Sequence, residues 1–421
     1  MFYKVYLCFT FPLVNLEGSF YDFIFSFYRR REATMNPTAV VRVCKLSVFL
    51  FSVCSTLLAP LVLTIGSEFN LGLQGSGLLF SFFFVGNFMA CAFCGKILSK
   101  FGNCHVLRFS LISMAVLSGM MVIAPRFSVI CAILFFLGFI TLIIQVAGTS
   151  IPSEIITGNT ASVMAGVQAF CALGAGSGLL WSGALMTLGY SWRRCYLSFS
   201  LLSLVGAIIA YFVSFPKLQQ KASGNLNEIL SLVNNPKFRS TFLFLFLYSG
   251  AESAIGSWLV TYLKNDLMFS SLSASAVTCT IWAFLFWGRL FCSNIVRIFP
   301  RRYILMILIL GSTICTFAIP HLNGVAIWFA AAFLGFLMSG IWPLVGANII
   351  EDTNYDKGTS LSIALLFSFL ACSIIPYLIG MVAGLFSLSI AISTIGGVFS
   401  ILFVFFLLEV GFWRIKGKSS V

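Results

Sequence analysis

The chain has 421 residues, of which 60% are hydrophobic and 9% are charged, and its formal net charge at pH 7 is +13. The positive charge does not indicate a nucleic-acid-binding protein, because the basic residues lie in short segments beside long hydrophobic stretches. The 13 cysteines lie mostly within apolar runs and are interpreted as small packing residues. Two histidines and no cluster of carboxylates predict neither a metal site nor another cofactor.

Residues 1–43 are predicted to form an N-terminal extension that is disordered or lies at the membrane interface. Its apolar stretch is interrupted by Pro12, Glu17 and Asp22, which makes it a poor membrane span. The absence of a small-residue cleavage site disfavours a signal peptide. Met35 follows three consecutive arginines and is an alternative start of a shorter protein.

Twelve long apolar stretches follow this extension. About 20 helical residues, at about 1.5 Å per residue, cross a hydrocarbon core of roughly 30 Å. Each stretch is therefore predicted to be a transmembrane helix. The predicted spans are residues 46–66, 76–98, 106–124, 128–150, 160–187, 195–214, 240–263, 271–292, 303–320, 324–346, 360–384 and 386–410.

Lys and Arg are unevenly distributed among the loops between these spans. With the N-terminus placed in the cytoplasm, 21 basic residues fall on the cytoplasmic side, and only Arg126, Arg193, Arg194 and Lys264 fall on the other side. Cytoplasmic loops of membrane proteins carry such an excess of Lys and Arg. The distribution predicts a multi-pass protein of an inner or plasma membrane, with both termini in the cytoplasm.

A polar segment divides the predicted spans into two sets of six. The predicted domains are an N-terminal six-helix bundle (44–214), a cytoplasmic linker (215–239), a C-terminal six-helix bundle (240–410) and a cytoplasmic tail (411–421). Within the linker, Leu226–Val233 is predicted to form a short amphipathic helix at the membrane surface. The fold class is therefore an all-α membrane protein with twelve transmembrane helices in two bundles. Such a layout is expected of alternating access, in which a central site opens to each side in turn.

The loop after the second span carries a recognisable motif. Gly95, Lys100 and Gly102 lie in the register of the G-x-x-x-D-R-x-G signature, and the segment resembles the major facilitator superfamily, with Ser99 at the acidic position. The resemblance implies the fold of two six-helix bundles and a transport function. In that family the acid helps to latch the two halves on the cytoplasmic side, and Ser99 does not carry its charge.

Span seven provides a second resemblance. Residues 248–258 read Tyr-Ser-Gly-Ala-Glu-Ser-Ala-Ile-Gly-Ser-Trp, which resembles the corresponding helix of the fucose and glucose/galactose permease branch of that superfamily. Gly288 and Arg289, at the end of span eight, resemble another recurrent superfamily element. The resemblance to this branch implies a sugar transporter of the symporter type.

Glu252 lies near the middle of span seven. A carboxylate at that depth costs several kcal/mol unless it faces a polar cavity, finds a partner or stays protonated. Three roles remain open for Glu252: a structural acid in a tightly packed helix, a site of proton coupling, and a contact of the solute. In each case the side chain is expected to face the interior of the protein.

The acids that the resemblance implies elsewhere are missing. The proton-coupled fucose permeases carry carboxylates on their first and fourth helices, whereas span one has none and Gln145 lies at the place of the second. An amide does not titrate, but it donates and accepts hydrogen bonds and suits a neutral, hydroxylated solute. Uniport and symport coupled through Glu252 therefore both stay open.

Other polar and aromatic residues within the spans complete the candidate binding site. Amides in apolar surroundings must point inward to find partners, where they bind the solute or join helices. Indole rings stack on sugar rings, unless they anchor the protein at the membrane interface, which is the interpretation for Trp258. The candidate solute-binding residues are Asn87, Gln145, Gln168, Trp282, Ser339 and Trp342.

A glycine-rich stretch in span five bears on helix packing. Gly174 and Gly178 have the G-x-x-x-G spacing that lets two helices touch along their backbones. The version of this stretch that the family associates with antiport ends in Pro, whereas Leu179 follows Gly178 here, which disfavours drug/proton antiport.

Three functional classes are open to a protein with these spans: a secondary transporter, a membrane enzyme and a channel. The chain has no nucleotide-binding Gly-rich loop and no pair of titratable groups at one depth, so a transporter is favoured over an enzyme. The predicted partners are a small-molecule solute, protons and the lipid bilayer, and the protein is expected to be a monomer that does not bind nucleic acid. A sugar is the first choice of solute, and an organic anion or drug-like compound is the alternative.

Overall fold

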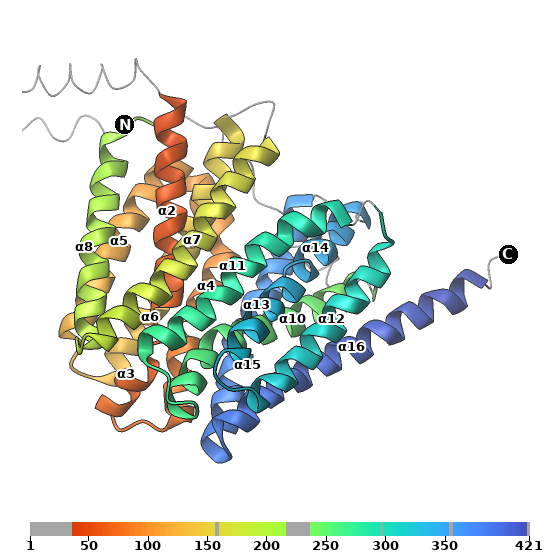
Figure 1. Cartoon of the computed structure of the whole chain (residues 1–421). Helices are drawn as coiled ribbons and strands as arrows, with labels where there is room; N and C mark the ends of the chain where they lie inside the picture. Colours follow the sequence, from red (N-terminus) through yellow and green to blue (C-terminus); the bar gives the residue numbers. More distant parts are fainter. Residues whose placement is uncertain (1–35, 156–159, 216–235, 296–297, 353–356, 419–421) are drawn as a thin grey trace, which may run out of the picture.

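The computed structural model describes residues 36–155, 160–215, 236–295, 298–352 and 357–418, and these are almost entirely helical (Figure 1). Within these ranges, twelve helices are long and apolar enough to cross a membrane, which confirms the twelve predicted spans. The elements are α2 (Pro37–Leu57), α3 (Val62–Glu68), α4 (Leu73–Phe101), α5 (Asn103–Ile123), α6 (Phe127–Ile155), α7 (Thr160–Thr187), α8 (Trp192–Phe212), α10 (Pro236–Asn265), α11 (Ser271–Ile295), α12 (Arg301–Ala318), η1 (Ile319–His321), α13 (Ala326–Met338), α14 (Ile341–Asp352), α15 (Lys357–Leu385) and α16 (Leu388–Lys418).

Two predictions from the sequence fall largely outside the described residues. The N-terminal extension is described only from residue 36 onward, so neither its interfacial placement nor the alternative start at Met35 is tested. The predicted amphipathic helix Leu226–Val233 also lies outside the described residues.

The first membrane helix begins at Pro37, well before the predicted start of the span at residue 46. Asn36 caps this end, because its Oδ1 accepts hydrogen bonds from the backbone N–H groups of Thr38 and Ala39, at 3.1 and 3.3 Å. A proline is favoured at the first helical position, where its missing N–H has no partner to lose. The prediction placed the start too late because basic residues interrupt the apolar run before residue 46.

The tenth predicted span is a broken helix. Its two parts, α13 and α14, are separated by Ser339 and Gly340, both of which are buried. Irregular backbone at membrane depth is tolerated only where it is buried in protein or lines a cavity. The break therefore marks a place where backbone groups of this span are available to neighbouring helices.

The two bundles repeat one packing scheme. In the N-terminal bundle, α2 packs on α7, α4 on α6 and α5 on α8; in the C-terminal bundle, α10 packs on α15, α11 on α13 and α12 on α16. These pairs are the first with the fifth, the second with the fourth and the third with the sixth span of each bundle. The internal repeat that the sequence suggests only weakly is thus plain in the packing.

Glycines set the closest of these contacts. A Cβ on Gly138 of α6 would collide with the carbonyl oxygen of Phe83 in α4, and a Cβ on Gly174 of α7 would collide with that of Phe49 in α2. The Oγ1 of Thr56 in α2 also donates to the carbonyl oxygen of Ala175, at 2.9 Å. The prediction that the glycine-rich stretch of span five lets helices touch along their backbones is confirmed.

The bundles meet each other through α4 with α15 and through α7 with α11. The close approaches include Gly77 of α4 with Gly380 of α15, and Gly183 of α7 with Ser275 of α11. All four residues lie near the ends of their helices that are adjacent to α3. Figure 1 shows the same arrangement, because the bundles come together near α3 and diverge toward the end at which α2 begins.

Trp258 lies in this contact between the bundles, and the prediction of an interfacial anchor is wrong. Its side chain is 0% exposed, its Nε1 donates to the carbonyl oxygen of Pro376 at 2.8 Å, and its ring packs against Phe80 of the other bundle. The position of Trp258 along the helix suggested the membrane interface. The ring is buried instead because two bundles converge at that depth.

Candidate functional site

The candidate site is built on one face of α10. Tyr248, Glu252 and Gly256 are spaced four residues apart and therefore lie above one another on the helix. Tyr248 is completely buried, whereas Glu252 is partly exposed.

Tyr248 joins α10 to the break in the tenth span. Its hydroxyl donates to the carbonyl oxygen of Met338, the last residue of α13, at 2.8 Å. Carbonyls at the end of a helix lack the N–H groups of a following turn, and the hydroxyl supplies a donor. The same hydroxyl also lies within hydrogen-bonding reach of Glu252. A tyrosine hydroxyl has one proton, so two acceptors share one donor here.

Helix α11 presents Trp282 and Arg289 to this region. The two residues are seven positions apart and so share a face of the helix. The ring of Trp282 lies beside Gly256, 3.5 Å from the position that a Cβ would occupy, and is partly exposed. Arg289 is exposed, and its charge acts on Glu252 of the same bundle and on Cys171 in α7 of the other bundle. A cation thus acts on the carboxylate, and an indole lies one turn further along α10, beside Gly256.

Gly288 explains how α11 comes so close to the broken span. A Cβ on Gly288 would collide with the side chain of Ser339 and would lie 3.0 Å from the carbonyl oxygen of Phe336. Ser339 itself is 2% exposed, and its Oγ donates to the carbonyl oxygen of Phe336 at 2.6 Å. Ser339 is therefore a packing residue at the break. It contacts Gly288, the residue that precedes Arg289 in α11.

The three candidate amides lie in the other bundle and are not brought together with Glu252 by any contact that the structure describes. Gln145 is partly exposed and Gln168 is exposed. Asn87 is 1% exposed, its Nδ2 donates to the carbonyl oxygen of Phe83 at 3.1 Å, and its Oδ1 has no partner. Asn87 lies where α4 and α6 touch, which favours a role in helix packing. Contact of these amides with a solute stays a prediction.

Trp342 follows the break at the start of α14. Its ring is partly exposed and packs against Gly346, one turn further along the same helix. The structure thus places Trp342 near the end of α13 but describes no contact between it and Glu252 or Trp282. Its role as a solute contact also stays a prediction.

The loop motif at the end of α4 is arranged by local interactions. Gly102 has a φ of +82°, a conformation that favours glycine, and its N–H donates to the carbonyl oxygen of Leu98 at 2.9 Å. Ser99 donates to the carbonyl oxygen of Lys96 in its own helix, at 3.1 Å. The exposed Lys100 lies over the ring of Phe101. Gly95 is exposed on the same last turns of the helix.

Two residues of the site were missed or misjudged from the sequence. Tyr248 was recognised only as part of a motif, and Arg289 was placed too far toward the end of span eight to matter. The missed signal is that an arginine side chain reaches well beyond the depth of its own Cα, so its charge can act on an acid of a neighbouring helix. A carboxylate, a guanidinium and an indole that are each at least partly exposed can accept from, donate to and stack on a small polar molecule.

The chain matches the family model of the Major Facilitator Superfamily over residues 46–376. That match covers most of the sequence, and the chain therefore belongs to this superfamily and is an integral, multi-pass membrane protein. The resemblance seen in the loop and helix motifs is confirmed.

Among curated proteins, the chain is 27% identical over 234 residues to a protein of Helicobacter pylori (strain ATCC 700392 / 26695) named "Putative glucose/galactose transporter". The match covers 50% of this chain and 57% of that protein, so the chain spans little more than half the length of this relative. A second relative, from Saccharomyces cerevisiae and named "Bypass of stop codon protein 6", is 26% identical over 178 residues, which cover 39% of this chain and 35% of that protein.

Solved structures share the fold at low sequence identity. A variant of the nucleoside transporter NupG superposes with a TM-score of 0.78 at 12% identity, covering 88% of this chain and 99% of that chain. The D-xylose-proton symporter gives a TM-score of 0.69 at 15% identity, with 88% of this chain and 97% of that chain covered. The fucose:proton symporter FucP of E. coli gives 0.60 at 17% identity, with 87% and 98% covered.

Proposed function

We propose that the protein transports a small polar solute, with a sugar as the first choice, across the membrane by alternating access. The observation that carries the proposal is the presence of Glu252, Trp282 and Arg289, each at least partly exposed, on two adjacent helices of an otherwise apolar bundle, with the charge of Arg289 acting on Glu252 and on Cys171 of the other bundle. Membership of the superfamily and the name of the Helicobacter relative support it. The protein is proposed to act as a monomer and without enzymatic activity.

The orientation proposed from the loops gives the described conformation a meaning. With both termini in the cytoplasm, the bundles are in contact at their outer ends and diverge at their cytoplasmic ends. The conformation is then the one that exposes the site to the cytoplasm. Rocking to the opposite state would separate Gly77 and Gly183 from their partners and would also part the ring of Trp258 from Phe80 of the other bundle.

Proton coupling is proposed to act through Glu252 and the hydroxyl proton of Tyr248. When Glu252 is ionised, its carboxylate competes with the Met338 carbonyl for one hydroxyl proton. When Glu252 is protonated, it donates to the Tyr248 oxygen, and the hydroxyl proton is free to serve Met338. The protonation state of Glu252 thus changes the hydrogen bonding at the break between α13 and α14, on which Ser339 and Gly288 pack.

The test is uptake of labelled glucose, galactose and fucose into proteoliposomes, with and without an imposed pH gradient. The wild-type protein is expected to take up at least one of these sugars, faster with an inward proton gradient. In Glu252→Gln, uptake is expected to lose its dependence on the gradient, because an amide does not titrate. Tyr248→Phe is expected to weaken that dependence as well. Full retention of gradient dependence in Glu252→Gln would exclude Glu252 as the coupling site.

An organic anion is the second candidate solute, and Arg289 is the observation that favours it. An exposed guanidinium beside the site matches a carboxylate or phosphate in a bidentate manner. In the same uptake assay, excess neutral sugar and excess anionic sugar acid are compared as competitors. Stronger competition by the acid, lost in Arg289→Gln, would favour the anion over the sugar.

A further inference from the structure

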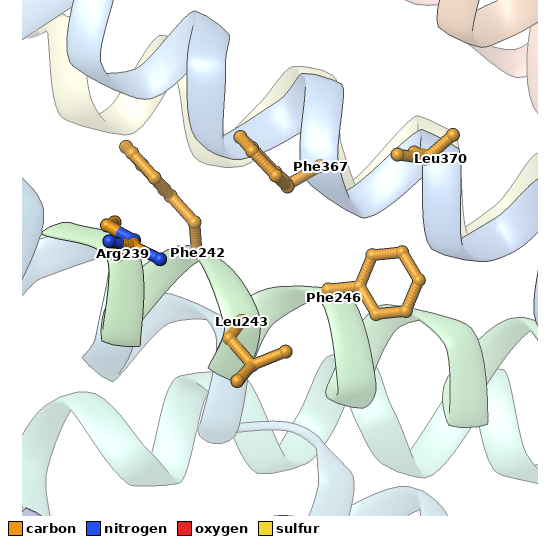
Figure 2. Close-up of a pocket in the computed structure, with 6 residues that line it drawn as sticks. All are labelled: Arg239, Phe242, Leu243, Phe246, Phe367 and Leu370. Carbon is orange, nitrogen blue, oxygen red and sulfur yellow. The ribbon is translucent and has the colours of Figure 1, made fainter. Parts of the chain in front are cut away.

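A groove separates α10 and α15 near the end of the bundle at which α10 begins. It has a volume of about 340 Å³. Figure 2 shows Arg239 at one end and the ring of Phe242 beside that of Phe367, with Phe246 and Leu370 further along. The residues that line this α10–α15 groove are Arg239, Phe242, Leu243, Phe246, Phe367 and Leu370.

The groove lies on the opposite side of α10 from the candidate transport site. An α-helix turns by about 100° per residue, so Leu243 and Glu252, nine positions apart, point in opposite directions. On α15, Leu370 is followed at intervals of four residues by Ile374 and Leu378, which are 39% and 48% exposed. Exposed apolar side chains in such a row are expected to face lipid. The α10–α15 groove therefore opens toward the bilayer and is not part of the solute path.

The charge in the groove lies where a membrane has its headgroups. Helix α10 begins at Pro236, and its uninterrupted apolar run begins only after Arg239, at Phe242, so the exposed Arg239 is expected at the boundary of the hydrocarbon core. Among the residues that the structure describes, the ion pair between Arg193 and Glu68 does not involve Arg239, and no described carboxylate is paired with Arg239. A guanidinium at this depth attracts the phosphate of a lipid on the side of the membrane where basic loops gather.

The polarity of the groove changes along its length in the same order as that of a phospholipid. From Arg239 to Phe246, seven residues of helix descend about 10 Å into the core, and the described side chains that line the groove beyond Arg239 are all apolar. A cavity of about 340 Å³ is near the lower limit of ligand pockets and suits part of one acyl chain rather than a whole lipid. A free anion would leave the partly exposed rings of Phe246 and Phe367 uncovered, and a zwitterionic phospholipid would bring its own cation beside Arg239 together with its phosphate.

We propose that the α10–α15 groove binds one anionic phospholipid of the cytoplasmic leaflet, with its phosphate on Arg239 and an acyl chain along the partly exposed rings of Phe246 and Phe367. The lipid would contact α15, which packs on α4 of the other bundle, and α10, which carries Glu252. Binding to the folded bundle alone stabilises it by mass action. The proposal does not depend on the identity of the transported solute.

Native mass spectrometry of the full-length protein in detergent tests the proposal. The probes are phosphatidylglycerol and phosphatidylcholine with identical acyl chains, added at increasing concentration. The wild-type protein is expected to retain phosphatidylglycerol preferentially, and Arg239→Gln is expected to lower that retention about fivefold, to the level of phosphatidylcholine, which corresponds to about 1 kcal/mol. The matched control is Arg302→Gln. It removes an exposed arginine at the start of α12, which lies on the cytoplasmic side in the proposed orientation, as the start of α10 does.

A second pair of variants tests the apolar part of the groove while keeping the charge. Leu243→Trp fills the groove, and Ile401→Trp adds the same ring to an exposed position of α16. Retention of phosphatidylglycerol is expected to fall in Leu243→Trp and to stay unchanged in Ile401→Trp. Phosphatidylglycerol is also expected to raise the melting temperature of the wild type more than that of either groove variant.

Three results would overturn the proposal. Equal losses in Arg239→Gln and Arg302→Gln would mean that anionic lipids are held by general surface charge. Displacement of phosphatidylglycerol by millimolar inorganic phosphate would mean that Arg239 binds an anion without a chain. Unchanged retention in both Arg239→Gln and Leu243→Trp, with elution and helical content like those of the wild type, would mean that the lipid binds elsewhere.

Discussion

Two acidic residues of this protein, Glu68 and Glu252, have opposite surroundings. Glu68, between the first two spans, accepts hydrogen bonds from the Nε1 of Trp192 at 2.7 Å and from the guanidinium of Arg193. Arg193 also donates to the carbonyl oxygens of Val122 and Ala124, at 3.1 and 3.4 Å. The acid thus ties together the ends of three helices, and its hydrogen-bonding capacity is used within the protein.

Glu252 has a cation nearby but does not form an ion pair with it. Arg289 acts on it only at longer range, and the Tyr248 hydroxyl has the Met338 carbonyl as another acceptor. The carboxylate therefore keeps free acceptor capacity, with an exposed guanidinium acting on it at longer range. The comparison teaches that the number of partners around an acid, rather than the acid itself, separates a structural role from a binding role.

The largest effect on stability is expected at Gly288, which precedes Arg289 and lets α11 pack closely on the broken span. Gly288→Ala should destabilise the protein by about 1–3 kcal/mol, because the added Cβ meets Ser339 and the Phe336 carbonyl in a tightly packed contact. Gly397→Ala is the matched control, since its Cβ meets nothing within 4 Å and a helical alanine is favoured by about 1 kcal/mol. Thermal unfolding in detergent measures both. Equal melting temperatures would show that α11 tolerates displacement from α13.

Arg289→Gln tests whether the surroundings of Glu252 serve binding rather than stability. Transport is expected to fall at least about tenfold, equivalent to about 1.4 kcal/mol, because one charge-assisted contact to the solute or to Glu252 is lost. The melting temperature should change little, because the side chain is exposed. Arg289→Lys should restore part of the rate. A large loss of stability without loss of transport per folded molecule would make Arg289 structural, like Arg193.

Glu68 gives the opposite expectation. The hydrogen bond from Arg193 lowers the pKa of Glu68 below its ordinary value of 4.5. A lowered pKa in the folded state means that the stabilisation is present above pH 4.5 and is lost as the pH falls through the folded value. Because the pair is 30% and 39% exposed, Glu68→Gln should cost only about 1 kcal/mol at neutral pH.

The check on Glu68 is thermal unfolding between neutral and acidic pH. The difference between wild type and Glu68→Gln should shrink as the wild-type carboxylate becomes protonated. Transport per folded molecule should be unchanged in the variant. A loss of transport at wild-type stability would give Glu68 a functional role and remove the contrast with Glu252.

The sequence predicted the architecture because hydropathy and loop charge are strong, additive signals in a membrane protein. It did not predict the break at Ser339 and Gly340, since a turn inside an apolar run changes no hydropathy. It misjudged Trp258 because depth along one helix does not reveal where another bundle will cover it. Arg289 was discounted for the same reason: which side chains meet depends on how tilted helices cross, and a linear pattern of residues does not contain that information.

The smallest effect on stability is expected from replacing Asn87, a buried polar residue that, unlike Glu68, lacks a partner for its side-chain oxygen. Its Oδ1 is buried without a partner and its Nδ2 bonds only a carbonyl of its own helix. Replacing an unsatisfied amide by an apolar group of similar size removes a desolvation cost, so Asn87→Leu should leave the melting temperature unchanged or raise it, by at most about 1 kcal/mol in stability. If Asn87 only packs α4 against α6, transport stays at the wild-type rate. Loss of transport in a protein of undiminished stability would instead mean that the amide becomes exposed in the opposite state and contacts the solute there. The Oδ1 that has no partner in the described conformation would then be a solute-binding atom.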